Sequence, residues 1–120
     1  MKNKRILTRF KRHNRIKMRV RGTLERPRLV IRRSLKNLFV EAIDDTRNKI
    51  LFGASTLDLD FKKQFSCAGN VKAAETFGVF CAAKVKTAGI SKIVFDRAGY
   101  LYHGRVKSFA EALRKGGLEF

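Results

Sequence analysis

Basic side chains are distributed so unevenly along this chain that the distribution limits which part of it can build a folded core. Residues 1–33 contain 14 of the 28 lysines and arginines but only one acid, Glu25, so this segment has a net charge of +13. The remaining 87 residues carry nine acids and a net charge of +5. Because charged side chains are rarely buried unless they are paired, we expect residues 1–26 to form a basic arm and residues 27–120 to form one α/β domain.

The net charge of the whole chain points to an anionic partner. A folded protein of 120 residues with a charge of +18 repels itself unless a polyanion neutralises it. Nucleic acid is the first such polyanion to consider, and an anionic membrane surface is the second. The sequence has no apolar run of about 18 residues that would span a membrane. Its arginine-rich start lacks the serine enrichment of mitochondrial transit peptides, and Ile6 and Leu7 are too short a cluster for a signal peptide.

The arm has the periodicity of an amphipathic helix. Ile6, Phe10, Ile16 and Val20 fall on one face at about 100° per residue, while arginines and lysines cover most of the remainder. Like charges at helical spacing oppose a helix in isolation. We therefore predict that the arm is disordered alone and becomes helical on a polyanion. The alternative is a solvated, frayed tail without a role.

The first part of the domain predicts three strands in an antiparallel meander. The first strand begins with the apolar run 29–31 and continues to Ser34, and the next two comprise residues 38–43 and 50–54. Short polar segments that resemble turns separate them. In the second run, Leu38, Val40 and Ala42 share one face. Arg32, Arg33 and Lys36 would cluster at the first hairpin tip, either to grip RNA or only to solubilise a sheet edge. Phe39 fits packing on the sheet better than a stacking platform.

The second part predicts helices and a fourth strand. Residues 57–67 are ambiguous between a short helix and an ordered loop, and Gly69-Asn70 then begins a helix that runs to Ala88. Its predicted buried face consists of small or apolar residues: Val71, Ala74, Gly78, Cys81, Ala82 and Val85. Residues 90–95 predict a parallel fourth strand, because a helix separates them from the third. A last helix follows, with Val106, Phe109, Ala110 and Leu113 as its apolar stripe and Gly116-Gly117 as its end.

The loop between the fourth strand and the last helix has an unusual composition. Residues 96–105 contain two tyrosines, a histidine, two arginines and two glycines. Arginine forks onto phosphate oxygens, and tyrosine or histidine stacks on unpaired bases, which favours RNA. The alternative is that Tyr100, Tyr102 and His103 only cover the end of the sheet.

Catalysis and metal binding find little support. The candidates for catalytic residues are His103, Asp96, Tyr100 and Tyr102, but no nucleophile elbow, phosphate-cradling loop or zinc motif is present. Asp58 and Asp60 fit solvated charges at a helix start. Cys67 and Cys81 show no metal-ligand spacing and need no disulfide. We therefore expect no enzyme activity, no cofactor, no metal site and no small-molecule substrate.

Several motifs resemble one known family. The segment from Phe95 to Val106 is similar to the signature of bacterial large-subunit ribosomal protein eighteen. Further similar motifs follow in order along essentially the whole chain: Arg26-Pro27-Arg28-Leu29, Arg33-Ser34 with Lys36, Ala54-Ser55-Thr56-Leu57, Gly69-Asn70 with Ala73-Ala74, and Gly117-Leu118-Glu119-Phe120. Ala98 departs from the usual glycine of the family, which leaves a positive φ there open, and Phe39 departs from the common tyrosine.

The resemblance implies a fold, partners and a location. The fold would be a mixed sheet of about four strands flanked by helices, of the ribonuclease-H-like type without its catalytic acids. The partners would be 5S rRNA, 23S rRNA and neighbouring 5S-binding ribosomal proteins, without a membrane, in the central protuberance of the large subunit of a cytoplasmic ribosome. The residues expected to bind rRNA are Arg5, Arg9, Arg12, His13, Arg15, Arg19, Arg21, Arg26, Arg32, Arg33, Ser34, Lys36, Asn37, Arg97, Tyr100, Tyr102, His103, Gly104 and Arg105.

Overall fold

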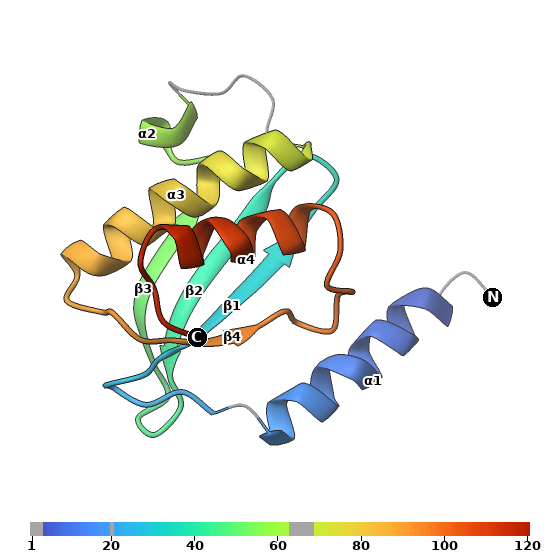
Figure 1. Cartoon of the computed structure of the whole chain (residues 1–120). Coiled ribbons are helices and arrows are strands. Elements are labelled where there is room, and N and C mark those ends of the chain that lie inside the picture. Colours follow the sequence, from blue (N-terminus) through green and yellow to red (C-terminus); the bar gives the residue numbers. More distant parts are fainter. Residues whose placement is uncertain (1–3, 20, 63–68) are drawn as a thin grey trace.

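The chain folds into a four-stranded mixed sheet with two long helices on one face and a separate basic helix at its side (Figure 1). The computed structural model describes residues 4–19, 21–62 and 69–120. Its elements in chain order are α1 (Lys4–Arg19), β1 (Arg28–Arg33), β2 (Leu38–Asp44), β3 (Lys49–Ser55), α2 (Leu59–Lys62), α3 (Val71–Thr87), β4 (Val94–Asp96) and α4 (Arg105–Lys115).

The sheet has the strand order β3-β2-β1-β4. Strands β1, β2 and β3 form the predicted antiparallel meander, and β4 runs parallel to β1. The predicted α/β class, the mixed sheet and the parallel direction of the fourth strand are therefore confirmed. The ribonuclease-H-like type implied by the resemblance stays an expectation.

The predicted fourth strand was too long at its start. We expected residues 90–95, whereas β4 comprises only Val94–Asp96. The preceding residues are buried at Ile90 and Ile93, which explains their apolar character. Their backbone pairs with the C-terminal segment, because the Ile93 amide donates to the Glu119 carbonyl and the Glu119 amide donates to the Ser91 carbonyl. Residues 90–93 thus include buried side chains although they are not part of strand β4.

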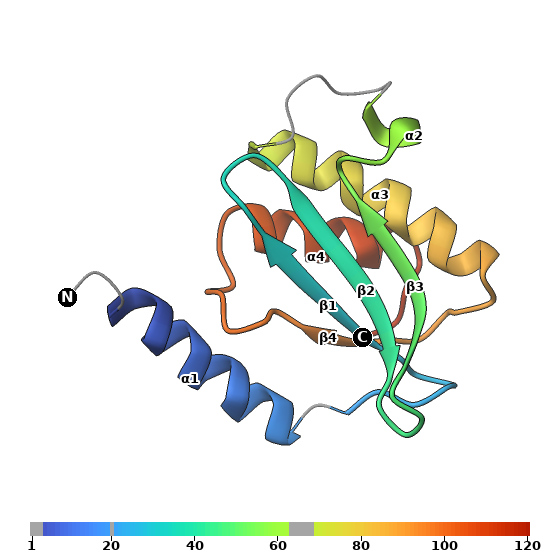
Figure 2. The ribbon, with the colours of Figure 1, turned by 180° about the vertical axis from the view of Figure 1, so that it is seen from behind.

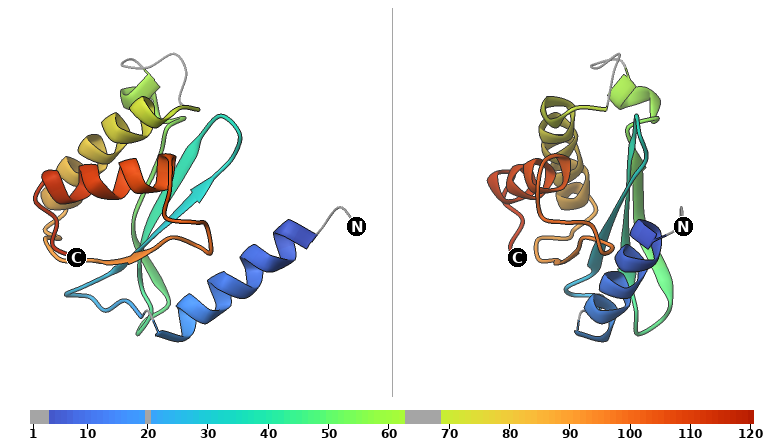
Figure 3. Two further views of the ribbon diagram at one scale, coloured as in Figure 1. Left: turned by 45° about the vertical axis from the view of Figure 1, so that its right-hand side comes forward. Right: turned by 90° about the vertical axis from the view of Figure 1, so that its right-hand side faces the viewer.

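The core lies between the sheet and the pair α3 and α4, which cover the same face in both views (Figure 2, Figure 3). Leu38, Val40 and Ala42 point into it from β2, as the alternation predicted. The apolar stripe of α4 is buried in full. The prediction for Val71 of α3 was wrong. This residue was expected in the buried face, but it is 51% exposed at the first position of the helix.

The end points of α3 follow from its flanking residues. The Asn70 side chain accepts a hydrogen bond from the Ala73 amide at 2.8 Å and caps the start of the helix. Gly89, at φ +86°, follows Ala88, which is the C-cap residue of the helix. The ambiguous segment after β3 contains the short helix α2 (Leu59–Lys62), while its residues 63–67, including Cys67, lie outside the described residues.

The arm is helical over Lys4–Arg19, as its periodicity predicted. Two members of its apolar face, Ile6 and Phe10, remain exposed, while the side chain of Ile16 and residue 20 lie outside the description. The views agree that α1 lies beside the β4 edge and not over the core (Figure 3). Disorder of the arm in the absence of a polyanion stays a prediction.

Candidate nucleic-acid interface

A buried arginine joins the segments that carry the predicted binding residues. Arg28 is only 7% exposed, and its guanidinium binds two carboxylates. Its Nη1 donates to Asp96 Oδ2 at 2.7 Å, and its Nε and Nη2 donate to Asp45 at 2.9 and 3.0 Å. The hydrogen bonds to Asp45 raise the pKa of Arg28 against the effect of burial. The same bonds, together with the Gly22 amide, lower the pKa of Asp45.

Asp45 ties the end of the arm to the turn between β2 and β3. Its Oδ2 accepts a hydrogen bond from the Gly22 amide at 2.7 Å, and its own amide donates to the Gly22 carbonyl at 3.0 Å. A Cβ at Gly22 would collide with the backbone of Arg28 and Ile43. The chain therefore needs a glycine here so that the base of the arm can lie against the sheet.

Asp96 shapes the loop that follows β4. Its Oδ1 accepts a hydrogen bond from the Ala98 amide at 2.8 Å, while its other oxygen is bound by Arg28. Ala98 has φ +54° and Gly99 has φ +81°, so two consecutive residues adopt left-handed backbone. The departure from glycine at Ala98 therefore does not prevent the positive φ, because the Asp96 carboxylate holds the turn.

Tyr100 links three segments of the chain. The Arg9 guanidinium of α1 lies 4.6 Å from the centre of its ring, and the Arg33 guanidinium of β1 lies 4.9 Å from it. Its hydroxyl donates to the Arg33 carbonyl at 3.3 Å and accepts from the Arg33 amide at 3.4 Å. Tyr100 is thus placed to assemble the basic segments, in addition to the stacking on bases predicted for it.

Two further arginines fix the loop. Arg12 Nε in α1 donates to the Gly99 carbonyl at 2.8 Å, and Arg97 Nη1 donates to the Tyr100 carbonyl at 2.6 Å. These contacts span 87 residues of sequence in the case of Arg12. They bring the arm against the loop, which the sequence did not predict.

Arg105 connects the loop to the first hairpin. Its Nη2 donates to the Ser34 carbonyl at 2.9 Å, while its Nη1 is buried without a hydrogen-bond partner among the described residues. Burial, and next the charge of Arg33, lower its pKa. The hairpin itself is closed by the Asn37 amide, which donates to Ser34 Oγ at 3.2 Å.

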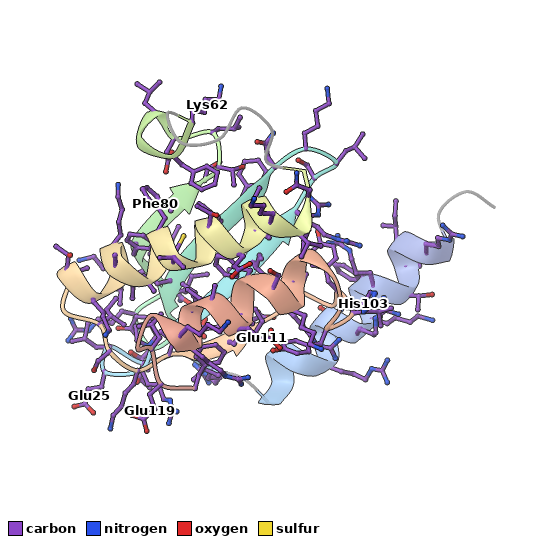
Figure 4. All side chains as sticks on the ribbon, turned by 45° about the horizontal axis from the view of Figure 1, so that its top comes forward. Glu25, Lys62, Phe80, His103, Glu111 and Glu119 are labelled. Atoms are coloured by element: carbon purple, nitrogen blue, oxygen red, sulfur yellow. The ribbon has the colours of Figure 1, made fainter. Side chains whose placement is uncertain are left out.

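The remaining predicted residues surround this framework. Tyr102 is 42% exposed, and His103 is exposed at the start of α4, far from Glu25 and Glu119 in Figure 4. Gly104 precedes α4 with φ +59°. Other exposed members are Arg5, Arg15, Arg21, Arg26, Arg32 and Lys36. The side chains of His13 and Arg19 lie outside the described part of the chain.

Sequence reasoning missed the role of Arg28, Asp45 and Asp96. Arg28 was one basic residue among many, and both acids were read as turn residues or as unused catalytic candidates. The signal that was available is that Asp96 directly follows a buried apolar run, where an acid needs a partner. That signal did not identify which of 28 basic residues supplies the partner.

The described residues offer little to alternative functions. Among them, no group of three histidines, cysteines or carboxylates lies together as a metal site. Within the same part of the chain, no helix combines the length and apolar character that crossing a bilayer requires. Cys81 is buried, and desolvation raises the pKa of its thiol, so it packs as a small apolar side chain.

Comparison with known proteins decides the family. Residues 3–120 match the model of ribosomal L18 of archaea, bacteria, mitochondria and chloroplasts. The chain belongs to this ribosomal L18 family. It is 52% identical over 112 residues to the large ribosomal subunit protein uL18 of Pelotomaculum thermopropionicum, across 93% of this chain and 92% of that protein. It is 42% identical to uL18 of Thermosynechococcus vestitus over 120 residues, across the full length of both.

Membership of the family confirms several predictions made from the sequence. The chain is a structural protein of the large ribosomal subunit, not an enzyme, and it sits in a cytoplasmic ribosome. Its partners are rRNA and other ribosomal proteins. The suspected relation to bacterial ribosomal protein eighteen is therefore confirmed.

Proposed function

We propose that this chain binds 5S rRNA and mediates its attachment to 23S rRNA in the central protuberance of the large subunit. One observation carries the proposal: three basic segments far apart in sequence meet around Tyr100. Arg9 comes from the arm, Arg33 from the first hairpin, and Arg97 from the loop that holds the tyrosine. Such an arrangement suits a folded RNA, whose backbone presents phosphates at several angles to one surface.

Different parts of this surface suit different contacts. The exposed arginines of α1 and the hairpin fit phosphate oxygens, which provide affinity without sequence information. Tyr102 and His103 are exposed beside them and fit unpaired bases or 2′-hydroxyls. The arm and the hairpin would therefore grip the RNA backbone, while the loop would supply discrimination between RNAs.

A titration with competing nucleic acids tests the proposal. The chain is mixed with labelled 5S rRNA at near-physiological salt, and tRNA, duplex DNA or anionic vesicles are added as competitors. We expect tRNA and DNA to displace 5S rRNA only at concentrations at least tenfold higher than unlabelled 5S rRNA requires. Equal competition by all polyanions would refute recognition of 5S rRNA and leave only non-specific charge binding.

Two substitutions separate affinity from discrimination. Arg15→Ala removes an exposed arm charge and should weaken binding to 5S rRNA and tRNA by a similar factor of about three to ten. Tyr102→Ala should weaken 5S rRNA more than tRNA, because stacking depends on an unpaired base in the right place. Gel-shift titrations of both RNAs give the ratios. Arg47→Gln, in the exposed turn between β2 and β3, serves as the control. The reverse pattern would contradict the assigned roles.

A further inference from the structure

A groove beside strand β4 adjoins the candidate interface and shares Arg26, Arg97 and Tyr102 with it. Its volume is about 800 Å³, within the range of small-ligand sites. β4 is an edge strand, so its free side is not covered by another strand. The groove lies there and is lined by residues of β4, of the end of the arm and of the C-terminal segment. Six of its lining residues matter for its chemistry: Arg26, Phe95, Arg97, Tyr102, Arg114 and Phe120.

The polar part of the groove consists of three arginines from three segments. Arg26 Nε donates to the Ile93 carbonyl at 3.1 Å, and Arg97 Nη1 donates to the Tyr100 carbonyl at 2.6 Å. A guanidinium has five N–H donors, so one bond to the protein orients it and leaves donors for a ligand. Glu119 is an acid next to the lining residue Phe120. Its Oε2 lies 4.0 Å from Lys92 Nζ, and this lysine partly offsets the negative charge of Glu119.

The apolar part of the groove is aromatic. The rings of Phe95 and Phe120 stack at a centroid distance of 5.6 Å, and the Arg114 guanidinium lies 4.4 Å from the centre of the Phe120 ring. The second contact holds the planar Arg114 guanidinium over the Phe120 ring. Tyr102 adds a ring that is 42% exposed. Planar groups of this kind stack on a nucleobase.

We infer that the groove holds a single unpaired nucleotide of ribosomal RNA, with its phosphate at Arg26 and Arg97 and its base against Tyr102 and Arg114. This inference rests on the proposed RNA-binding function. An acidic peptide would satisfy the arginines equally well. The nucleotide is favoured because Arg97 and Tyr102 also belong to the loop at Tyr100, so the groove continues the same surface.

Photo-crosslinking in the assembled subunit tests the occupant. Tyr102 is replaced by p-benzoylphenylalanine in the full chain, large subunits containing it are purified and irradiated, and crosslinked rRNA nucleotides are mapped by primer extension. We expect a strong stop at one or two adjacent unpaired nucleotides. The same replacement at Arg47 should not produce that stop. A crosslink to a ribosomal protein, to paired nucleotides only, or no crosslink at Tyr102 would overturn the inference.

Matched arginine variants provide a second measurement. If the nucleotide maps to 5S rRNA, we expect Arg114→Gln to weaken binding of 5S rRNA by about five- to tenfold. Arg114→Lys, which keeps the charge but loses the planar group, should weaken it by at least threefold. Arg47→Gln loses the same charge outside the groove and should change binding by less than twofold. Arg114 is exposed, and circular dichroism verifies that each variant is folded.

The two proposals fail in different ways. If the unmodified chain does not select 5S rRNA over tRNA, the proposed function fails before the groove is tested. If it selects 5S rRNA and the crosslink maps there, but Arg114→Gln, Arg114→Lys and Arg47→Gln all bind alike, the groove holds no nucleotide and the proposed function stands. If the crosslink maps to 23S rRNA, the same comparison is made by incorporation of each variant into large subunits, with the same expected order.

Discussion

At the scale of single residues, backbone conformation and charge pairing set the shape of the interface. Ala98 is buried and adopts a left-handed backbone that L residues rarely tolerate. It does so between Asp96, which accepts its amide hydrogen bond, and Gly99, whose carbonyl accepts from Arg12. Ala98 therefore connects two sets of contacts. On one side is the ion network of Asp96 and Arg28, and on the other is the hydrogen bond from Arg12 of the arm.

Enlarging the side chain at this position tests the strain. We expect Ala98→Val to lower the free energy of unfolding by about 2 kcal/mol, because a β-branched residue at positive φ is disfavoured. Ala98→Gly should stay within about 1 kcal/mol of the original, since relief of strain offsets the lost methyl contact and the greater freedom of the unfolded chain. Urea unfolding measures both. A Val variant as stable as the original would contradict the role of the turn.

Asp45 gives the protein an acid-sensitive element. Its pKa is lower in the folded chain than in the unfolded chain, because Arg28 and the Gly22 amide bind the carboxylate. The resulting stabilisation is fully present above its unfolded pKa of about 3.9 and is lost as the pH falls through the lower folded value. We expect Asp45→Asn to be less stable at pH 7 and to lose less stability on acidification below about pH 4. Thermal melts from pH 7 to pH 2.5 measure this. Parallel curves for both chains would contradict it.

At the scale of secondary-structure elements, the two core helices approach each other through a glycine. A Cβ at Gly78 of α3 would lie 2.5 Å from the Cβ of Ala112 and 2.8 Å from the Phe109 carbonyl, both in α4. The glycine on this predicted face thus permits close contact between the two helices. Because Gly104 is the N-cap of α4, the position of this helix also sets where the loop after β4 ends.

Filling this contact should separate packing from helix propensity. Alanine at position 78 gains about 1 kcal/mol of intrinsic helix propensity over glycine. We nevertheless expect Gly78→Ala to destabilise the chain by about 1–2 kcal/mol, because the backbone of α4 must shift. Val79→Ala, at an exposed site of the same helix, is the control and should stay within about 0.5 kcal/mol. Chemical denaturation provides the values, and a stabilised alanine variant would show that α4 moves freely.

At the scale of the whole molecule, charge is separated from the hydrophobic core. The core lies between the sheet and α3 and α4, whereas the helical arm lies at the β4 edge and touches the domain through Arg9 and Arg12 (Figure 1). The arm therefore contributes cationic surface without contributing a core. This arrangement brings the arm, the hairpin and the loop together around Tyr100, as the proposed binding of RNA requires.

Binding to RNA should depend steeply on salt. Each phosphate neutralised by the protein contributes about 0.7–0.9 to the slope of log K against log salt concentration. With arginines from three segments engaged, we expect a slope of about −4 or steeper for 5S rRNA. Filter-binding titrations from about 50 to 300 mM KCl measure this slope. The range includes the physiological ionic strength of about 150 mM. A slope near zero would contradict the grip on the phosphate backbone.

The sequence by itself determined the classes of elements, while the division into a basic arm and a domain stays a prediction. Alternating apolar residues in β2, the stripe of α4 and the cap at Asn70 each act within a few residues of one another, so local patterns reveal them. The short β4 and the exposed Val71 escaped prediction, because burial and pairing there depend on the C-terminal segment and on where a helix begins.

Only the tertiary structure decided which charged side chains form hydrogen bonds within the protein and which stay exposed. Arg28 binds carboxylates 17 and 68 residues away, and Arg12 reaches a carbonyl 87 residues away. Such partners are selected by strand register and by the path of the loop after β4, and every arginine in the sequence is chemically alike until these are known. The physical reason is that hydrogen bonds act over about 3 Å in space, whereas sequence patterns report only on neighbours along the chain.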